Sequence, residues 1–181
     1  MKMQAALFYG PRDVRLEYVD VPRAAAGEVT VQVEVALTCG TDLKTFQRGH
    51  PVLLKHFPSP FGHEFAGVVT EVGAGAEGFR PGMRVVAANS APCHQCFYCH
   101  AGETNLCEHL DLLNGAYAEY INIPAAIVQH NLVVLPDRLT YPEAAFCEPL
   151  ACVLHGLDAV RLRAGDHVAI LGAGSIGLLL V

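Results

Sequence analysis

Four of the seven cysteines in this chain lie within one short stretch, PCHQCFYCHAGETNLC, and this cluster limits the possible folds more than any other feature. The four are Cys93, Cys96, Cys99 and Cys107. Two residues separate each of the first three, so a turn can present their sulfur atoms to one point, and a longer return supplies the last. Because four thiolates complete the tetrahedral coordination of zinc and leave no open position, we predict a structural zinc site.

Other interpretations of this cluster remain open. A bacterial ferredoxin run, which binds an iron–sulfur cluster, shares the first spacings but has a shorter last gap followed by proline, whereas Glu108 follows Cys107 here. Free thiols on a loop would be chemically awkward at this spacing. His94, His100 and His109 lie among the cysteines and could bind metal, but the thiolates suffice, so we expect solvated loop residues.

The composition is that of a globular protein without a nucleic-acid or membrane partner. Hydrophobic residues make up 52% and charged residues 17%, which is enough to bury a core, and a net charge of −6 without a basic run disfavours nucleic acid and anionic membranes. The N-terminus lacks the apolar core of a signal peptide, and no stretch has the length of a membrane-spanning helix, so we expect a cytoplasmic protein.

Short apolar segments between glycine and proline turns dominate the N-terminal part of the chain. Val29, Val31, Val33 and Val35 alternate with polar residues, a period of two that predicts a strand with one buried face. Further strands are expected at residues 5–9, 14–19, 65–72, 84–88, 117–123 and 128–135. Many short strands of this kind predict a mainly β domain, built as a barrel or sandwich.

The pattern becomes helical further along the chain. Thr140 and Glu143 form a possible capping box, and Pro142 suits a first helical turn. Pro149 should kink or break this helix, and residues 150–160 resume a helical pattern.

A glycine-rich loop follows an apolar segment at residues 168–171, which is typical of a strand buried in a parallel sheet. The loop contains Gly172, Gly174, Ser175, Ile176 and Gly177. In the dinucleotide-binding fingerprint the first glycine permits a tight turn, the second lets the backbone approach a pyrophosphate, and the third allows close helix–strand packing. We therefore expect NAD or NADP as a cofactor, and the alternative is an ordinary strand-to-helix turn.

A second group of ligand-type residues is spread along the chain: Cys39, His63, Glu64 and Glu148. A catalytic zinc needs three protein ligands and an open position, which one thiolate, one imidazole and one carboxylate would provide. Taken singly, a cysteine at a strand end usually packs in a core, and a lone histidine usually makes a structural hydrogen bond.

Taken together, the motifs resemble those of the zinc-dependent medium-chain dehydrogenases. The matching segments are CGTD at 39–42, GHEFAGVV at 62–69, the four-cysteine stretch, GAYAEY at 115–120, EPLAC at 148–152 and LGAGSIG at 171–177. The glutamates beside His63 and Pro149 are most similar to the polyol and threonine dehydrogenase branch. The resemblance implies a GroES-like β-barrel catalytic domain at residues 1–149, with a structural zinc lobe at 90–110, and the truncated start of an α/β Rossmann cofactor-binding domain at 150–181.

The resemblance also implies that Cys39 and His63 bind a catalytic zinc, with Glu64 or Glu148 as the third ligand. His63 and Glu64 are adjacent and would point to opposite faces of a regular strand, so both reach one ion only from an irregular backbone. Both glutamates therefore stay open. Cys147, beside Glu148, is a less favoured sulfur ligand, which we expect to be a small buried helix residue.

Two neighbours of Cys39 gain roles from the same resemblance. Thr41 matches the hydroxyl that relays the alcohol proton, and Asp42 matches the carboxylate that orients the zinc-binding histidine. The alternatives are a turn-capping threonine and an N-cap or turn aspartate. Five further residues could line a substrate pocket, although packing or a loop position is the favoured interpretation for each: Phe46, His50, His56, Phe57 and Tyr117.

The expected function is hydride transfer between a small alcohol or polyol and NAD(P), with one catalytic and one structural zinc ion in each chain. The chain is expected to be a fragment of a homo-oligomeric parent, dimeric or tetrameric, and to be inactive and aggregation-prone alone. The alternative is a non-enzymatic zinc-ribbon and β-barrel binding module. That alternative accounts for the cysteine cluster but not for Cys39, His63 and the glycine loop together.

Overall fold

The central sheet brings distant parts of the chain together. In the computed structural model, which describes residues 1–54 and 56–181, its strands pair in the order β10, β6, β5, β3 and β9. They are β3 (Val29–Leu37), β5 (Glu64–Val72), β6 (Arg84–Ala87), β9 (Tyr120–Ile123) and β10 (Leu132–Val134). All neighbouring pairs are antiparallel. The end of β3 therefore lies beside the start of β5.

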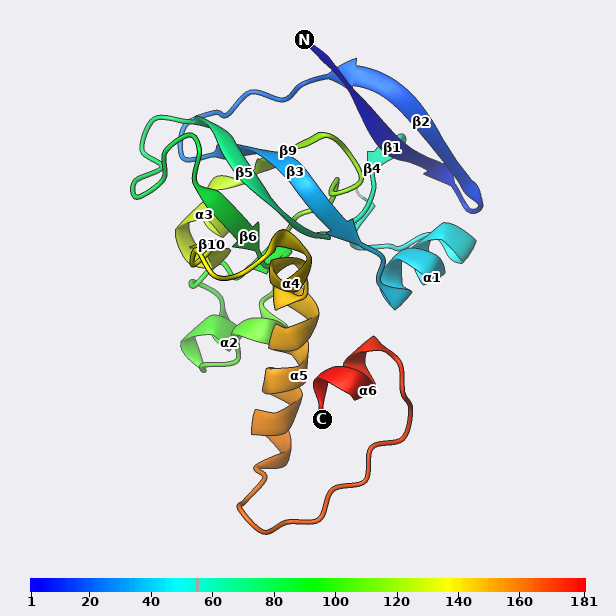
Figure 1. Ribbon diagram of the computed structural model, residues 1–181, viewed down its shortest axis with the longest axis vertical. Helices are drawn as coiled ribbons and strands as arrows, with labels where there is room; N and C mark the ends of the chain where they lie inside the picture. Colours follow the sequence, from blue (N-terminus) through cyan, green and yellow to red (C-terminus); the bar gives the residue numbers. More distant parts are fainter. Residues whose placement is uncertain (55) are drawn as a thin grey trace.

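A smaller sheet adjoins the central one. It pairs β2 (Asp13–Asp20), β1 (Lys2–Gly10) and β4 (Ser59–Pro60), and an isolated bridge joins Ala5 to Ala118. Figure 1 shows the β1–β2 hairpin at the upper edge of the molecule, with helix α1 (Gly40–Arg48) below its turn.

Alternation along β3 gives the core its inner face. Val29 and Val31 are fully buried and Gln32 and Glu34 are exposed, as the period of two predicts, but Thr30 on the other face is also buried and its hydroxyl donates to Asn122 at 3.2 Å. The buried core cluster that Val29 and Val31 join also contains Phe65, Val69, Val85, Ile121, Ile123 and Ile127. The prediction of a mainly β domain is confirmed.

One predicted strand is wrong in its first half. The apolar run at residues 128–135 forms helix α3 (Ala125–Asn131) before the short strand β10. Ile127 and Val128 are buried from this helix. A short apolar run does not distinguish a buried helix from a buried strand by periodicity alone, which explains the error.

The strand expected at residues 117–123 is shorter than predicted. Strand β9 begins only at Tyr120, because the backbone N–H groups of residues 115–117 donate to the carbonyl groups of Phe61 and Gly62. This segment therefore leaves the sheet and packs against the approach to β5.

The capping box at Thr140 is confirmed. The Thr140 side chain accepts from the Glu143 backbone N–H at 3.5 Å, and the Glu143 carboxylate accepts from the Thr140 N–H at 2.9 Å. Helix α4 (Tyr141–Ala145) follows, with Pro142 in its first turn, as predicted.

The helix break lies earlier than expected. Helix α4 ends at Ala145 and α5 (Cys147–Val160) begins after Phe146, so Pro149 breaks nothing. It lies in the first turn of α5, where a missing N–H costs no intrahelical hydrogen bond. The predicted domain boundary at residues 149 and 150 falls within this helix.

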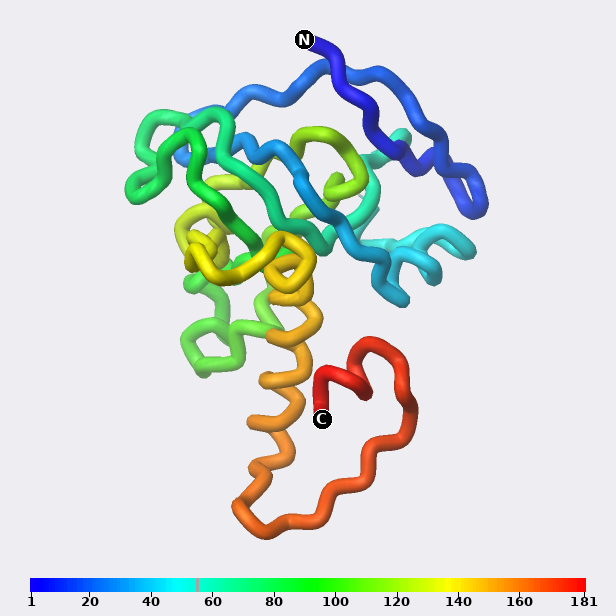
Figure 2. The backbone as a smooth tube through the Cα atoms, in the orientation of Figure 1, coloured from blue at the N-terminus to red at the C-terminus, as the bar shows by residue number. Residues whose placement is uncertain are grey.

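The chain after α5 turns back and runs beside it (Figures 1 and 2). It ends in the short helix α6 (Ser175–Leu179). Residues 168–171 pair with no other strand among the described residues and are not assigned as one. The Rossmann start at this place stays a prediction.

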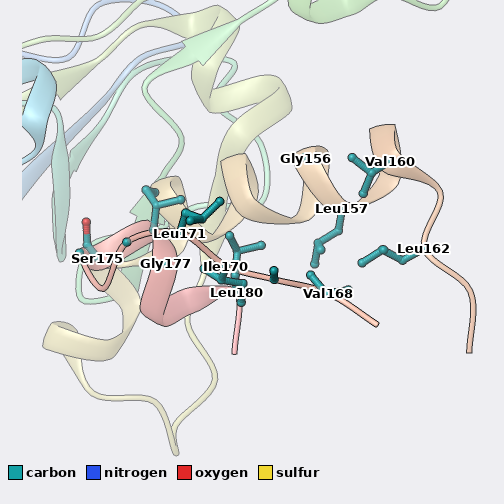
Figure 3. A pocket seen from close by; sticks show the side chains of 14 residues that line it. Gly156, Leu157, Val160, Leu162, Val168, Ile170, Leu171, Ser175, Gly177 and Leu180 are labelled. Atoms are coloured by element: carbon teal, nitrogen blue, oxygen red, sulfur yellow. The ribbon is translucent and has the colours of Figure 1, made fainter. Parts of the chain in front are cut away.

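An apolar cleft of about 680 Å³ separates α5 from this returning segment (Figure 3). Leu157, Val160, Val168, Ile170 and Leu180 line it. No helix in the described part of the chain is both long and apolar enough to cross a membrane.

Candidate metal centres

The first candidate centre forms where two neighbouring strands end and begin. Leu37, the last residue of β3, pairs with Glu64, the first residue of β5. Cys39 follows β3 by two positions and His63 immediately precedes β5. The sulfur of Cys39, a ring nitrogen of His63 and a carboxylate oxygen of Glu64 all lie within 4.8 Å of one another.

The backbone before β5 has the irregular geometry that this convergence needs. Gly62 has a φ of +85°, a left-handed conformation, and only after it does the regular strand begin. His63 thus lies outside the strand and Glu64 at its first position, so the two side chains need not alternate across the sheet. A Cβ on Gly62 would lie 2.6 Å from the ring of Tyr117. Only glycine meets both demands.

Asp42 connects Cys39 and His63 through hydrogen bonds. Its Oδ1 lies 3.0 Å from His63 Nδ1, and its Oδ2 accepts from the Cys39 backbone N–H at 2.9 Å. Cys39 is the N-cap of α1, and its side chain accepts from the Thr41 N–H at 3.4 Å. The N-cap alternative for Asp42 is therefore wrong, because Asp42 is the third helical residue and caps Cys39 in a capping box. This capping contact and the contact with His63 are compatible, because the two carboxylate oxygens serve different partners.

Burial dominates the electrostatics of this centre. It raises the pKa of the Cys39 thiol and of the Glu64 carboxyl. Burial alone would lower the pKa of His63, but the hydrogen bond to Asp42 and the neighbouring carboxylates raise it. In Asp42 burial opposes hydrogen bonds from His63 and Cys39, which lower its pKa.

The donor set suits a zinc ion. A buried cation would offset the desolvation of the Cys39 thiolate and the Glu64 carboxylate, and Asp42 already engages His63 Nδ1, which leaves Nε2 for a metal. Thiolate, imidazole and carboxylate together occupy three positions of a tetrahedral ion and leave the fourth open.

Glu148 and Cys147 lie near this centre without joining its closest group. Glu148 is at the start of α5, where burial raises its pKa and the charge of His63 lowers it, so the two groups share one environment. Cys147 is half-buried and packs beside the small cluster around Ala66 and Val86. The described geometry brings Glu64, rather than Glu148, to Cys39 and His63.

The second candidate centre is the four-cysteine lobe. Strands β7 (Ser90–Ala91) and β8 (Asp111–Leu112) pair at its base, and α2 (Phe97–His100) and the 3-10 helix η1 (Thr104–Leu106) form its body. The sulfur atoms of its four cysteines all lie within 4.8 Å of one another. These are Cys93, Cys96, Cys99 and Cys107.

Backbone hydrogen bonds favour the thiolate form of part of this cluster. Backbone N–H groups donate to the sulfur of Cys107 from Cys93 at 3.2 Å and from His109 at 3.3 Å. Backbone hydrogen bonds, the largest from Cys99, lower the pKa of Cys96 to about 6, whereas desolvation and the neighbouring sulfurs of Cys96 and Cys107 raise the pKa of Cys99. Stabilised thiolates at this spacing fit a closed zinc site. The ring of His94 packs on that of His130, with centroids 4.4 Å apart.

The glycine loop has the backbone features that its motif predicts. Gly172 has a φ of +118°, and a Cβ on Gly177 would lie 1.9 Å from the Gly172 carbonyl oxygen. Gly174 is the N-cap of α6, which contains Ser175 and Ile176. The first and third glycines are therefore required by the turn itself.

The polar role of Tyr117 does not follow from the sequence pattern. Its hydroxyl lies 2.8 Å from Asp42 Oδ2 and 3.0 Å from the Leu37 carbonyl oxygen. The motif GAYAEY was visible, but nothing in its pattern indicates a partner that lies 75 positions away.

Comparison with known families now adds to this geometry. Residues 25–137 match the family described as the alcohol dehydrogenase GroES-like domain, which is more than half of the chain. The chain belongs to this family. The resemblance to the N-terminal part of zinc-dependent medium-chain dehydrogenases is thereby confirmed.

Several relatives of this GroES-like chain are dehydrogenases of diols and polyols. It is 34% identical to (R,R)-butanediol dehydrogenase of Bacillus subtilis, over 99% of this chain and 54% of the relative. It is 36% identical to erythritol/L-threitol dehydrogenase of Mycolicibacterium smegmatis, over 98% and 52%. The chain thus spans about half the length of the curated relatives it matches.

Solved structures agree in fold. A zinc-binding dehydrogenase from Sinorhizobium meliloti, bound to NADP, superposes with a TM-score of 0.89 at 35% identity, covering 100% of this chain and 52% of that one. The GroES-like fold of the chain is therefore shown by both sequence and structure.

Proposed function

We propose that this chain supplies the substrate-activating centre of a zinc-dependent dehydrogenase that transfers hydride between a small alcohol or polyol and NAD(P). The observation that carries the proposal is the convergence of Cys39, His63 and Glu64 within 4.8 Å, in a set of donors that leaves one position open. The activities of the diol and polyol dehydrogenases among its relatives support the substrate class.

In this proposal Cys39, His63 and Glu64 hold the catalytic zinc, and Glu148 is the alternative carboxylate. A zinc ion bound there acts as a Lewis acid that lowers the pKa of a substrate hydroxyl. Asp42 holds the ring of His63 in one orientation and one tautomer through its 3.0 Å contact with Nδ1. Glu64 and Glu148 bring negative charge to the site and favour binding of a cation.

Thr41 is proposed to accept and pass on the substrate hydroxyl proton. It lies in the first turn of α1, half-buried, directly beside Cys39. A hydroxyl can both accept and donate, which a proton relay requires. This role stays a prediction.

The lobe of Cys93, Cys96, Cys99 and Cys107 is proposed to hold a structural zinc that stabilises the fold. Four thiolates leave no room for substrate, so the lobe takes no part in the chemistry. The glycines of the loop at Gly172, Gly174 and Gly177, with Ser175 and Ile176, are proposed to approach the pyrophosphate of NAD or NADP.

The wider setting is proposed from composition and kinship. The whole protein is expected to be a cytoplasmic homo-oligomer, dimeric or tetrameric, without a nucleic-acid or membrane partner. The net charge of −6 supports the absence of nucleic-acid binding.

The test is turnover of the whole protein with a panel of diols and polyols, read as reduction of NAD or NADP. Cys39→Ala should lower kcat/KM by at least about a thousandfold, because the substrate loses its Lewis acid, while the variant remains folded at the assay temperature. Tyr9→Phe, which removes the side-chain hydrogen bond to Glu17 in the β1–β2 hairpin, is the control and should retain turnover. Undiminished turnover in a zinc-free Cys39→Ala protein would refute the proposal.

A further inference from the structure

Tyr117 contacts the candidate centre through Asp42, and neither the fold nor the donor set requires a hydroxyl there. Asp42 is buried, with 4% of its surface exposed, and His63 is buried with 2%. Three donors surround the Asp42 carboxylate: His63 Nδ1 at 3.0 Å, the Cys39 N–H at 2.9 Å and the Tyr117 hydroxyl at 2.8 Å. The Tyr117 hydroxyl comes from the segment before β9, whereas the proposed ligands lie at the end of β3 and the start of β5.

We propose that Tyr117 is a positioning residue that fixes the Asp42 carboxylate and, through it, the metal-binding geometry of His63 and Cys39. This inference rests on the proposed function, because it assumes that Cys39 and His63 bind a metal.

The physical argument begins with the carboxylate. Rotation about the bond that carries a carboxylate is broad, so the group turns easily unless hydrogen bonds hold both oxygens. Oδ1 of Asp42 faces His63, and Oδ2 takes the donors from Cys39 and Tyr117. Loss of one donor to Oδ2 therefore loosens the plane in which Oδ1 meets the imidazole ring.

The Tyr117 proton has a second acceptor within reach, the Leu37 carbonyl oxygen at 3.0 Å. The shorter bond goes to the charged acceptor, and hydrogen bonds to a carboxylate are the stronger kind. Because the hydroxyl carries a single proton, the Leu37 carbonyl at the end of β3 is a competing acceptor for it.

The ring of Tyr117 is held independently of its hydroxyl. It lies edge-on to Phe61, with centroids 5.5 Å apart, and its backbone N–H donates to the Phe61 carbonyl at 2.9 Å. Gly62 faces the ring directly. Tyr117→Phe keeps these contacts and removes only the hydroxyl, so it isolates the proposed role.

The chain offers a matched control. The Tyr9 hydroxyl donates to Glu17 Oε1 at 2.7 Å, a tyrosine–carboxylate bond of the same kind in the β1–β2 hairpin. Tyr9→Phe removes this bond away from both candidate centres. Asp42→Asn shows how much zinc affinity is lost when the direct hydrogen-bond partner of His63 is changed, and the effect of Tyr117→Phe is compared with that loss.

The experiment measures zinc dissociation constants by competition with a chelator, in the wild-type chain and these variants. Asp42→Asn should weaken the Cys39, His63 and Glu64 site by about 10- to 100-fold, the usual effect of removing a partner of a metal-binding histidine. Tyr117→Phe should weaken it by roughly tenfold, the lower end of that range, because its effect is indirect. Tyr9→Phe should change nothing.

Two readouts separate positioning from general damage to the fold. Affinity at the four-cysteine lobe should be the same in wild type and Tyr117→Phe, and the visible spectrum of Co²⁺ in the Cys39, His63 and Glu64 site should change only in Tyr117→Phe and Asp42→Asn. In the Asp42→Asn background, adding Tyr117→Phe should have little further effect.

Wild-type affinity and spectrum in Tyr117→Phe, with two zinc ions bound, would overturn the inference and leave the proposed function standing. An undiminished effect of Tyr117→Phe in the Asp42→Asn background would also overturn it, since Tyr117 would then act by another route. A wild-type chain that binds zinc only at the four-cysteine lobe would refute the proposed function itself.

Discussion

At the residue scale, a single left-handed glycine decides how the centre is built. Gly62 lets two adjacent side chains, His63 and Glu64, turn toward Cys39 instead of alternating. The sequence predicted these ligand types and the need for an irregular backbone there. It did not predict the ring of Tyr117 against Gly62, because a contact between distant aromatic and glycine positions leaves no periodic pattern.

Gly62→Ala should therefore destabilise the fold by more than its backbone strain alone. The φ of +85° costs a non-glycine residue about 1 kcal/mol, and overlap of the new Cβ with Tyr117 adds to it, for a total of roughly 2–4 kcal/mol. Urea unfolding monitored by circular dichroism measures the difference.

Gly75→Ala is the matched control for this change. Gly75 has the same φ of +85°, and nothing lies within 4 Å of its Cβ position. It should lose only about 1 kcal/mol. Equal losses in the two variants would show that the contact with Tyr117 carries no energetic weight.

At the scale of elements, local sequence patterns predicted most of the strands and the start of one helix. They did not predict the elements whose type or end is decided by packing against the rest of the chain. The alternation in β3 and the capping box before α4 follow from side chains a few positions apart. Helix α3 and the break at Phe146 do not follow from such nearby side chains. A short apolar run can form either a helix or a strand, and only the surrounding core selects one.

The capping box should give α4 a pH-dependent contribution to stability. The Thr140 hydroxyl and backbone N–H lower the pKa of Glu143 from its ordinary value of 4.5. The folded-state pKa is below the unfolded one, so this stabilisation is complete above pH 4.5 and is lost as the pH falls through the folded-state value.

Glu143→Gln should accordingly lower the melting temperature at pH 7 and have little effect in acid well below pH 4.5. Thermal melts at the two pH values test this. Glu77→Gln, at an exposed position in a turn, should have no effect at either pH. A Glu143→Gln penalty that persists unchanged in acid would contradict the capping explanation.

The four-cysteine lobe should contribute stability rather than activity. Cys96→Ala opens its proposed zinc site and should destabilise the chain by about 3–4 kcal/mol when free zinc exceeds the dissociation constant by about 100- to 1,000-fold. Cys147→Ala, in a half-buried helix position, is a control that should cost less. An unchanged unfolding midpoint in Cys96→Ala would contradict a structural site.

At the scale of the whole molecule, the apolar side chains of α5, α6 and the segment between them are the least covered part of the structure. Leu171, which lines the cleft shown in Figure 3, is 99% exposed, and Leu178 in α6 is 67% exposed. Exposed apolar surface of this kind favours self-association.

Leu171→Asp combined with Leu178→Asp should reduce self-association of this chain, measured by sedimentation velocity, without lowering its unfolding midpoint. Leu16→Asp, at a position 75% exposed on β2, is the control and should leave self-association unchanged. Equal reduction by both changes would indicate a general charge effect instead of association through this surface.

The central claim is that three residues from two separate segments bind one metal ion, and the zinc content of purified protein tests it most directly. Measured by mass spectrometry, the wild-type chain should contain two zinc ions, whereas Cys39→Ala and Cys96→Ala should each contain one. A wild-type chain with a single zinc ion, or a Cys39→Ala chain that still contains two, would contradict the account.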